Sequence, residues 1–390
     1  MFRINRFQEL LKFLPRSSFE GMVARHQADK HSKGFGCWDQ LVAMLYAQLS
    51  GASSLRVLEA GFNSQRRHHY HLGVRAIKRT TLADANARRD PAVFEEAVRT
   101  LMAGVARSVR QQSQHLMYLL DSSPIALRGL EFDRWTQDNK TGHTQGLKLH
   151  VLLNAHDQTP QWHSITAPNV NDLTEGQKVP IEPGARYVFD KGYCDYSWWH
   201  RIEQAQAFFV TRFKRNAKLH VVHSAPVSQA DASWLISDEQ VCLSNKNPRG
   251  GRINPYDKPL RRVVVRRQGY ATALVLATND LSSPASEIAQ HYKQRWGIEL
   301  FFKWIKQHLK IKRFLGRSAN AVRLQILTAL MAYLLLSLLN RAQGGKKTLW
   351  LLLAEVRESL FDRLQPDQGW SQRRRRHQQE LLKNQATLFG

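Results

Sequence analysis

Four side chains with complementary chemistry lie at helical spacing in residues 291–316. Glu299 lies seven residues after Tyr292 and seven before Lys306, and Arg295 lies four before Glu299. Because an α-helix has 3.6 residues per turn, the spacing predicts that all four share one helix face. Such a face carries a carboxylate, two cations and a phenol, a set suited to holding a metal ion and a phosphodiester together. The alternative is an exposed amphipathic helix stabilised by its own ion pairs.

Two aspartates stand where short apolar runs end. Asp121 ends the run in HLMYLLDSSPIAL, and Asp190 ends the run in ARYVFDKGYCD. A strand delivers such a side chain to the edge of its sheet, although a turn or capping role is the ordinary alternative for a single aspartate. Mg2+ prefers hard oxygen ligands, and three carboxylates can hold two ions about 3.5–4 Å apart. With Glu299, these aspartates predict a site for two Mg2+ ions, for which Mn2+ can substitute.

The spacing Y-x2-R-x3-E-x6-K, the strand-like LLDSSPI and the D-x-G-Y motif at Asp190 together resemble a known pattern. They are similar to the signature of bacterial insertion-sequence transposases of the DDE type. The resemblance runs from about residue 116 to 342. It implies a ribonuclease-H-like catalytic core whose Asp121, Asp190 and Glu299 are the catalytic metal ligands.

The same resemblance implies roles for residues that bind DNA rather than metal. In relatives, the Tyr, Arg and Lys of the signature hold strand ends and phosphates, which here would be Tyr292, Arg295 and Lys306. Relatives also stack an aromatic side chain of an inserted segment on a flipped base. Trp234 is the candidate, since no other Trp lies between 200 and 295. A buried core tryptophan is the alternative.

The elements that must position these residues predict an α/β fold. Strand-like runs at 146–155 and 161–168 follow the run that ends at Asp121, and a helix and a further strand follow Asp190. This order predicts the mixed sheet of a ribonuclease-H-like core. We divide the chain into a helical DNA-binding region at 1–112, a core at 113–342 with a β-rich insertion at about 216–284, and a helical basic tail at 343–390.

The charge of the chain indicates its partner. Lys and Arg number 57 against 32 Asp and Glu, which gives a net charge of +25. This excess favours a polyanion such as nucleic acid. By the resemblance, we expect double-stranded DNA, both the terminal inverted repeats and the target. By the resemblance, the synaptic complex is expected to be a homodimer. The arginine run at 373–376 is expected to be a solvated arm that touches DNA backbone.

Three segments could suggest other functions. The apolar run at 324–339 is 16 residues long, so we expect a buried core helix rather than a membrane span. The three cysteines form no CxxC pattern, which favours no zinc knuckle or disulfide framework. We therefore expect no membrane partner and a bacterial cytoplasmic, nucleoid-associated protein. Asp172 is a weaker acidic candidate, for which a capping or loop role is expected.

Part of the helical N-terminal region has an open interpretation. Thr80 and Thr81 could cap a short helix, LADANARR, which is either the recognition helix of a helix-turn-helix or a solvated basic helix. His68, His69 and His71 have no acidic or Cys partner at ligand spacing, so we expect a DNA-facing or merely exposed loop there rather than a metal site.

The sequence predicts a cut-and-paste transposase that cuts DNA by metal-dependent hydrolysis and joins 3′ ends to a target. Two alternatives share many of its features. A nuclease with the same core would cut without joining, and a DNA-binding repressor would have lost catalysis. The presence of all three carboxylates disfavours the repressor.

Overall fold

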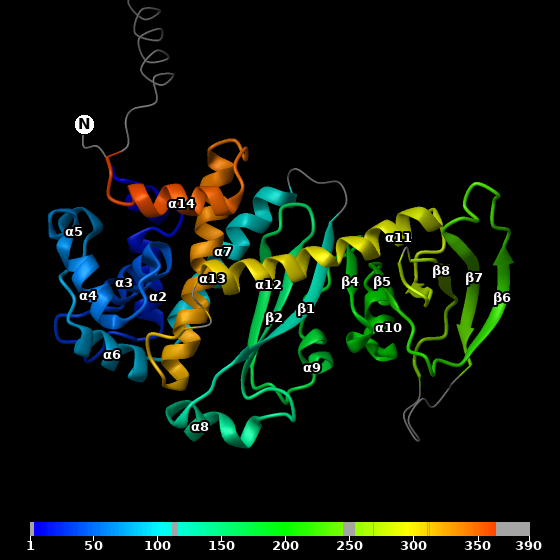
Figure 1. Ribbon diagram of the computed structural model, residues 1–390, viewed down its shortest axis with the longest axis horizontal. Coiled ribbons are helices and arrows are strands. Elements are labelled where there is room, and N and C mark those ends of the chain that lie inside the picture. The colour runs from blue at the N-terminus through cyan, green and yellow to red at the C-terminus, as the bar shows by residue number, and fades with distance from the viewer. Residues whose placement is uncertain are drawn as a thin grey trace, which may run out of the picture.

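The computed structural model describes residues 4–110, 116–244, 254–267, 269–309, 311 and 313–363 (Figure 1). Its α-helices are α1 Arg6–Leu11, α2 Arg16–Arg25, α3 Cys37–Ser50, α4 Leu55–Ser64, α5 Arg66–Leu72, α6 Arg79–Arg88, α7 Ala92–Arg110, α8 Leu130–Thr136, α9 Asp172–Gly176, α10 Tyr196–Gln204, α11 Ala285–Gln294, α12 Trp296–His308, α13 Ala319–Ala342 and α14 Leu349–Ser359. Its strands are β1 Met117–Ala126, β2 Gly146–Asn154, β3 Pro160–Thr166, β4 Arg186–Phe189, β5 Phe208–Arg212, β6 Leu219–Ala225, β7 Leu235–Leu243, β8 Leu260–Val265 and β9 Leu274–Thr278.

One sheet organises the molecule, with strand order β3-β2-β1-β4-β5-β9-β8-β7-β6. Strands β1, β4 and β5 run parallel to one another, while β2 and β3 are antiparallel to their neighbours. The order and directions of the first five strands are those of a ribonuclease-H-like sheet. The predicted fold class, an α/β ribonuclease-H-like core, is therefore confirmed.

Both faces of this sheet are covered, and the alternation of side chains along β1 assigns each face. Leu119 belongs to the apolar core that includes α12 and α13, whereas Leu120 belongs to the core that includes α10. Because successive side chains of a strand point to opposite faces, Asp121 lies on the same face as Leu119. The strand therefore directs Asp121 toward α12, which contacts β1.

The predicted β-rich insertion forms strands β6 to β9, and it continues the same sheet. Strand β9 pairs with β5 through Val210↔Thr278, and β8, β7 and β6 follow outward. Figure 1 shows these strands at the end of the sheet opposite the N-terminal helices. Residues 245–253, between β7 and β8, lie outside the described residues.

Helix α13 is the central apolar helix of the structure. Its most apolar 18-residue window is 89% buried, as expected for a core helix formed by the run at 324–339. It packs against α3, α6 and α7 of the N-terminal region and also against α12 and α14. The N-terminal helices and the sheet thus share one apolar core. The division at residues 112 and 342 stays a prediction, and its first boundary falls outside the described residues.

Two local expectations for the N-terminal region are wrong. Helix α6 begins at Arg79, and its N-cap residue Lys78 makes no capping side-chain hydrogen bond, so Thr80 and Thr81 lie inside its first turn. The histidines lie in helix α5 instead of a loop, and the buried His69 ring places Nε2 3.0 Å from the Phe62 carbonyl oxygen. A tertiary hydrogen bond, which the local pattern does not show, orders this segment.

The C-terminal tail is described only to residue 363. Helix α14 lies in this described part, and it packs against α3 and α13. The predicted basic arm at 373–376 lies outside the described residues.

Candidate active site

The signature segment forms two helices that meet at Arg295 instead of the one expected helix. The Arg295 backbone keeps right-handed helical angles, and its amide donates to the Tyr292 carbonyl over 3.1 Å. Figure 1 shows α11 and α12 running on from each other across the sheet. Gly297 allows α12 to approach β1, because a Cβ there would lie 3.2 Å from Leu119 Cδ1. The predicted shared face is therefore largely retained.

Arg295 joins two of the three predicted carboxylates. Its Nη2 lies 2.5 Å from Glu299 Oε1, and its Nη1 lies 3.5 Å from Asp121 Oδ2. Asp121 comes from β1 and Glu299 from the covering helix, so the fold brings together residues that are far apart in sequence. The Nε atom of Arg295 is buried and has no hydrogen-bond partner.

The third predicted carboxylate, Asp190, directly follows β4 and is held by two side chains. Arg212 Nη2 lies 2.6 Å from Asp190 Oδ1, and the Tyr292 hydroxyl donates to the same oxygen over 3.4 Å. The guanidinium carbon of Arg212 lies 6.0 Å from the centroid of the Tyr292 ring, and that of Arg295 lies 5.8 Å from it. Tyr292 thus links the aspartate to the two arginines.

Sequence reasoning missed Arg212, which the sheet places in line with both aspartates. The register pairs Leu119 with Val188 and Val188 with Val210 across three parallel strands. Two residues further along these strands stand Asp121, Asp190 and Arg212. The sequence did contain a sign of this residue. The strand-like run AFFVTR ends on a charged residue as the other two runs do, but the residue is a cation, Arg212, and not an acid.

Lys306 lies on α12 but contacts the strand beside the carboxylates. Its Nζ donates to Ser123 Oγ over 2.6 Å and to the Pro124 carbonyl over 2.9 Å. These acceptors lie two and three residues after Asp121 on β1. Lys306 therefore fastens the signature helix to the strand that carries the first aspartate.

The surroundings of Asp121 and Asp190 shift their pKa values in opposite directions. The pKa of Asp121 is raised to about 6, chiefly by burial and also by the nearby Asp190 and Glu299, against the lowering effects of the Ser122 amide and Arg295. Burial also acts to raise the pKa of Asp190, but hydrogen bonds from Arg212 and the Lys191 amide outweigh it and leave that pKa lowered. Asp190 and Glu299 therefore both lie within electrostatic reach of Asp121.

The chemistry of the three carboxylates fits a divalent metal, although their oxygen atoms are not arranged around a common point in this structure. Carboxylate oxygens are the ligands that hard divalent cations prefer. Within the described residues, however, no three His, Cys, Asp or Glu side chains converge closely enough to hold an ion. The guanidinium groups of Arg212 and Arg295 contact the carboxylates instead. Metal binding would therefore have to exchange these ion pairs for metal–oxygen bonds.

Trp234 lies away from this cluster. It directly precedes β7, four strands from β4, which corresponds to roughly 19 Å across the sheet. Its indole Nε1 donates to Asp231 Oδ1 over 3.1 Å, and its ring is partly buried against the apolar core. Trp296, which sequence reasoning did not single out, follows Arg295 directly and is 58% exposed.

Asp172 does not have the expected capping role, because Asn171 caps α9. Instead, Asp172 Oδ1 accepts hydrogen bonds from Ser122 Oγ over 2.8 Å and from Lys148 Nζ over 3.0 Å. It therefore ties α9 to the residue that follows Asp121. By strand alternation, Ser122 points to the opposite sheet face from Asp121.

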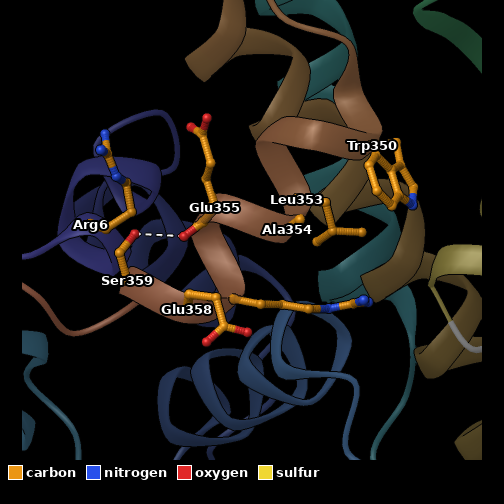
Figure 2. Close-up of a pocket in the computed structure, with 8 residues that line it drawn as sticks. Arg6, Trp350, Leu353, Ala354, Glu355, Glu358 and Ser359 are labelled. Atoms are coloured by element: carbon orange, nitrogen blue, oxygen red, sulfur yellow. Dashed lines mark hydrogen bonds between the residues drawn. The ribbon is translucent and has the colours of Figure 1, made fainter.

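The hollow in Figure 2 is separate from the carboxylates. It is formed by α14 and α1, with Trp350, Leu353 and Glu358 among its lining residues. None of the predicted site residues lines it, and we assign it no role.

A stability measurement tests the environment of Asp121. The folded-state pKa of about 6 exceeds the ordinary aspartate value, so the folded protein binds more protons than the unfolded chain between about pH 4 and 6. This group therefore contributes stability below about pH 4 that is lost as pH rises through 6. We expect Asp121→Asn to stabilise the metal-free protein by about 1–3 kcal/mol near pH 8, with the gain vanishing near pH 4. Urea unfolding in chelator measures this, and equal wild-type and variant stability near pH 8 would contradict the assigned environment.

The fold and site together define a class of protein. A ribonuclease-H-like sheet that carries two aspartates on neighbouring parallel strands, where the pairing of these strands ends, and a glutamate from a covering helix beside them is the architecture of metal-dependent enzymes that cut and join polynucleotides.

Comparison with known proteins assigns the particular family. The family "Transposase DDE domain" matches residues 112–335, and a domain of unknown function matches residues 4–75. The chain therefore belongs to the DDE transposases, the cut-and-paste enzymes of mobile elements, which depend on divalent metal and act on DNA.

Individual relatives agree with this family. A putative transposase, y4zB of Sinorhizobium fredii, is 45% identical over 262 residues, which cover 67% of this chain and 71% of that protein. A probable transposase for insertion sequence element IS5377 of Geobacillus stearothermophilus is 30% identical over half of each chain. A putative transposase for insertion sequence element IS4SA of Synechocystis is 27% identical and covers 73% of this chain and 78% of that one.

Among solved structures, a cryo-EM structure of the piggyBac transposase synaptic complex with hairpin DNA is similar at a TM-score of 0.46 and 13% identity. The match covers 92% of this chain and 80% of that one.

Proposed function

We propose that the chain binds the terminal inverted repeats of its own insertion sequence, cleaves the DNA at their ends and joins the resulting 3′ ends to target DNA. The observation that carries this proposal is the bridge from Arg295 to both Asp121 and Glu299. It supports a single site built from the strand ends and the signature helix. The bacterial relatives are transposases of insertion elements, which supports the same class of substrate.

The three carboxylates would be the metal ligands of this site. Asp121, Asp190 and Glu299 supply hard oxygen atoms, which favour two Mg2+ ions, with Mn2+ as a substitute. When bound, such ions activate the attacking water or 3′-hydroxyl and stabilise the leaving oxygen of an in-line displacement. The raised pKa of Asp121, about 6, implies that in the metal-free protein this ligand is mostly ionised only above that pH.

The cations of the site would grip the DNA backbone. Two guanidinium groups, of Arg212 and Arg295, now offset the repulsion among three carboxylates. Once the carboxylates bind metal, these arginines are free to donate paired hydrogen bonds to phosphate oxygens. Tyr292, between the two arginines, and Lys306, beside β1, would help to hold the strand ends in line for attack.

Further parts of the proposal concern the complex as a whole. We propose a homodimer in the synaptic complex, because two element ends must be held together. Trp234 stays a candidate for stacking on a flipped base, and the exposed Trp296 is a second candidate nearer the carboxylates. The helical region at 1–112 would contribute DNA binding, and the enzyme would act on nucleoid DNA in the bacterial cytoplasm.

A cleavage assay tests this function against a catalytically inactive repressor. The purified chain is incubated with a labelled duplex that carries the terminal repeat, either with Mg2+ or with chelator. We expect binding in both conditions and cleavage at the repeat end only with Mg2+. Binding without cleavage in either Mg2+ or Mn2+ would favour the repressor.

A further inference from the structure

A cluster of polar side chains lies behind Asp121, on the opposite face of the sheet. The register places Ser122 beside His150 and His150 beside Ser164, so these three side chains share that face. Helix α9 contacts β1 here and contributes Asp172, and His150 is fully buried. Burying polar groups is costly unless they are paired, so the partners of these groups decide what the cluster can hold in place.

Asp172 is tied to two strands through a single oxygen atom. Its Oδ1 accepts from Ser122 Oγ of β1 over 2.8 Å and from Lys148 Nζ of β2 over 3.0 Å. The same Lys148 Nζ donates to the Val170 carbonyl over 2.8 Å, which fixes the segment just before α9. Asp172 is therefore held from the strand side as well as by its own helix.

Ser122 passes this constraint on to the first predicted metal ligand. Its backbone amide donates to Asp121 Oδ1 over 2.8 Å. Ser122 lies two residues beyond Leu120, where the pairing of β1 with β4 ends, and here a side-chain oxygen accepts from its amide. The other carboxylate oxygen, Oδ2, is the one that lies 3.5 Å from Arg295 Nη1. The Ser122 peptide unit thus decides which oxygen of Asp121 faces the signature helix.

Helix α9 also reaches the second predicted aspartate. Gly176, at the end of α9, lies so close to the buried Tyr193 ring that a Cβ there would be 2.9 Å from Tyr193 Cδ1. Tyr193 ends the 3-10 turn that follows Asp190, and its amide donates to the Asp190 carbonyl over 3.0 Å. One short helix therefore contacts the residues that follow both aspartates.

We propose that Asp172 is a positioning residue of the metal site, which fixes the orientation of the Asp121 carboxylate through Ser122. The inference rests on the proposed function, since it takes Asp121 as a metal ligand. Asp172 contacts the side of β1 that faces away from the metal site, so it acts through Ser122 and is not itself a ligand. Groups that orient a ligating carboxylate commonly change metal affinity by about 10–100-fold when they are lost.

Metal binding to the full chain tests this proposal. The chain is bound to a duplex that ends at the cut terminal repeat, and Mn2+ is titrated by calorimetry. We expect Ser122→Ala and Asp172→Ala each to weaken Mn2+ binding about tenfold. In cleavage of an uncut duplex, both variants should raise the Mg2+ concentration for half-maximal rate by about the same factor. Their maximal rates should stay within about threefold of wild type, because the ligands themselves remain.

Conservative variants and a matched control isolate the hydrogen bond. Asp172→Asn keeps an oxygen that can accept from Ser122, and Ser122→Thr keeps the hydroxyl donor, so both should bind Mn2+ within about threefold of wild type. Ser164→Ala is the matched control. It removes a hydroxyl that donates to Glu175 Oε2 of the same helix over 2.6 Å, but it leaves Asp172 on Ser122 and Lys148. Its Mn2+ affinity should also stay within about threefold of wild type.

The outcomes separate a positioning role from a structural one. Wild-type Mn2+ affinity in both Ser122→Ala and Asp172→Ala would overturn the inference, as would an equal loss in Ser164→Ala. A lower thermal midpoint in chelator together with a lower maximal rate, at an unchanged Mg2+ requirement, would assign Asp172 to stability alone and overturn it too.

Asp121→Ala distinguishes failure of this inference from failure of the proposed function. If that variant loses Mn2+ binding while Ser122→Ala and Asp172→Ala keep wild-type affinity, only the positioning role is wrong. If Asp121→Ala binds Mn2+ as wild type does, Asp121 is not a ligand, and both the inference and the proposed metal site are wrong.

Discussion

Replacing Asp121, Asp190 or Glu299 with alanine is expected to abolish DNA cleavage and joining while leaving DNA binding largely intact. Each substitution removes one of the three proposed metal ligands, two of which contact Arg295 and one Arg212, and phosphate contacts rather than the metal supply most of the affinity. We expect the cleavage rate to fall by at least about 10³-fold, since loss of one preorganised charge-stabilising group commonly costs 10²–10³-fold. Single-turnover cleavage of a duplex with the terminal repeat measures this.

Asp172 provides the matched control for these variants. It lies beside the same strand and hydrogen-bonds Ser122, but that side chain points to the other sheet face. Asp172→Asn should therefore retain much more cleavage than any of the three alanine variants. Cleavage above a few per cent of wild type in Asp121→Ala, Asp190→Ala or Glu299→Ala would remove that residue from the ligand set.

The second large effect is expected at Arg295. Its guanidinium contacts two carboxylates in the metal-free protein and is positioned to move to a phosphate when they bind metal. Arg295→Ala should slow cleavage by about 10²–10³-fold at saturating Mg2+, because a preorganised cation is lost. The Mg2+ concentration for half-maximal rate should stay unchanged or fall, since a competitor of the metal has been removed.

Two other variants calibrate that Mg2+ titration. Lys306→Ala removes a cation that contacts Ser123 and the Pro124 carbonyl, so it should slow cleavage without raising the Mg2+ requirement. Glu299→Asp retracts a carboxylate by one methylene and should raise the requirement. If Arg295→Ala raises the requirement and Glu299→Asp does not, the proposed roles on this helix are reversed.

The grouping of these carboxylates was predictable because the sequence around each of them has a recognisable local pattern. Asp121 and Asp190 end apolar runs, and in the structure they directly follow Leu120 and Phe189, the last pair in the parallel register of β1 and β4, although β1 itself continues to Ala126. Arg295 and Glu299 are one helical turn apart, and this contact survives the break between α11 and α12. These features depend on secondary structure alone, which sequence periodicity shows.

The rest of the site depends on tertiary contacts that periodicity does not encode. Arg212 contacts Asp190 only because β5 is placed beside β4 in parallel register. Lys306 contacts β1 because Gly297 lets α12 approach the strand closely. Likewise, α6 needs no cap of its own because Glu59, on another helix, holds its first amide.

The most direct test of the account is an end-joining assay with purified protein, repeat-bearing duplex, supercoiled target DNA and Mg2+. The account predicts covalent products in which the 3′ ends of the duplex are joined to the target, and their absence with the Asp190→Ala variant. Efficient cleavage at the repeat end with no joined product would contradict transposition and assign the chain to the metal-dependent nucleases.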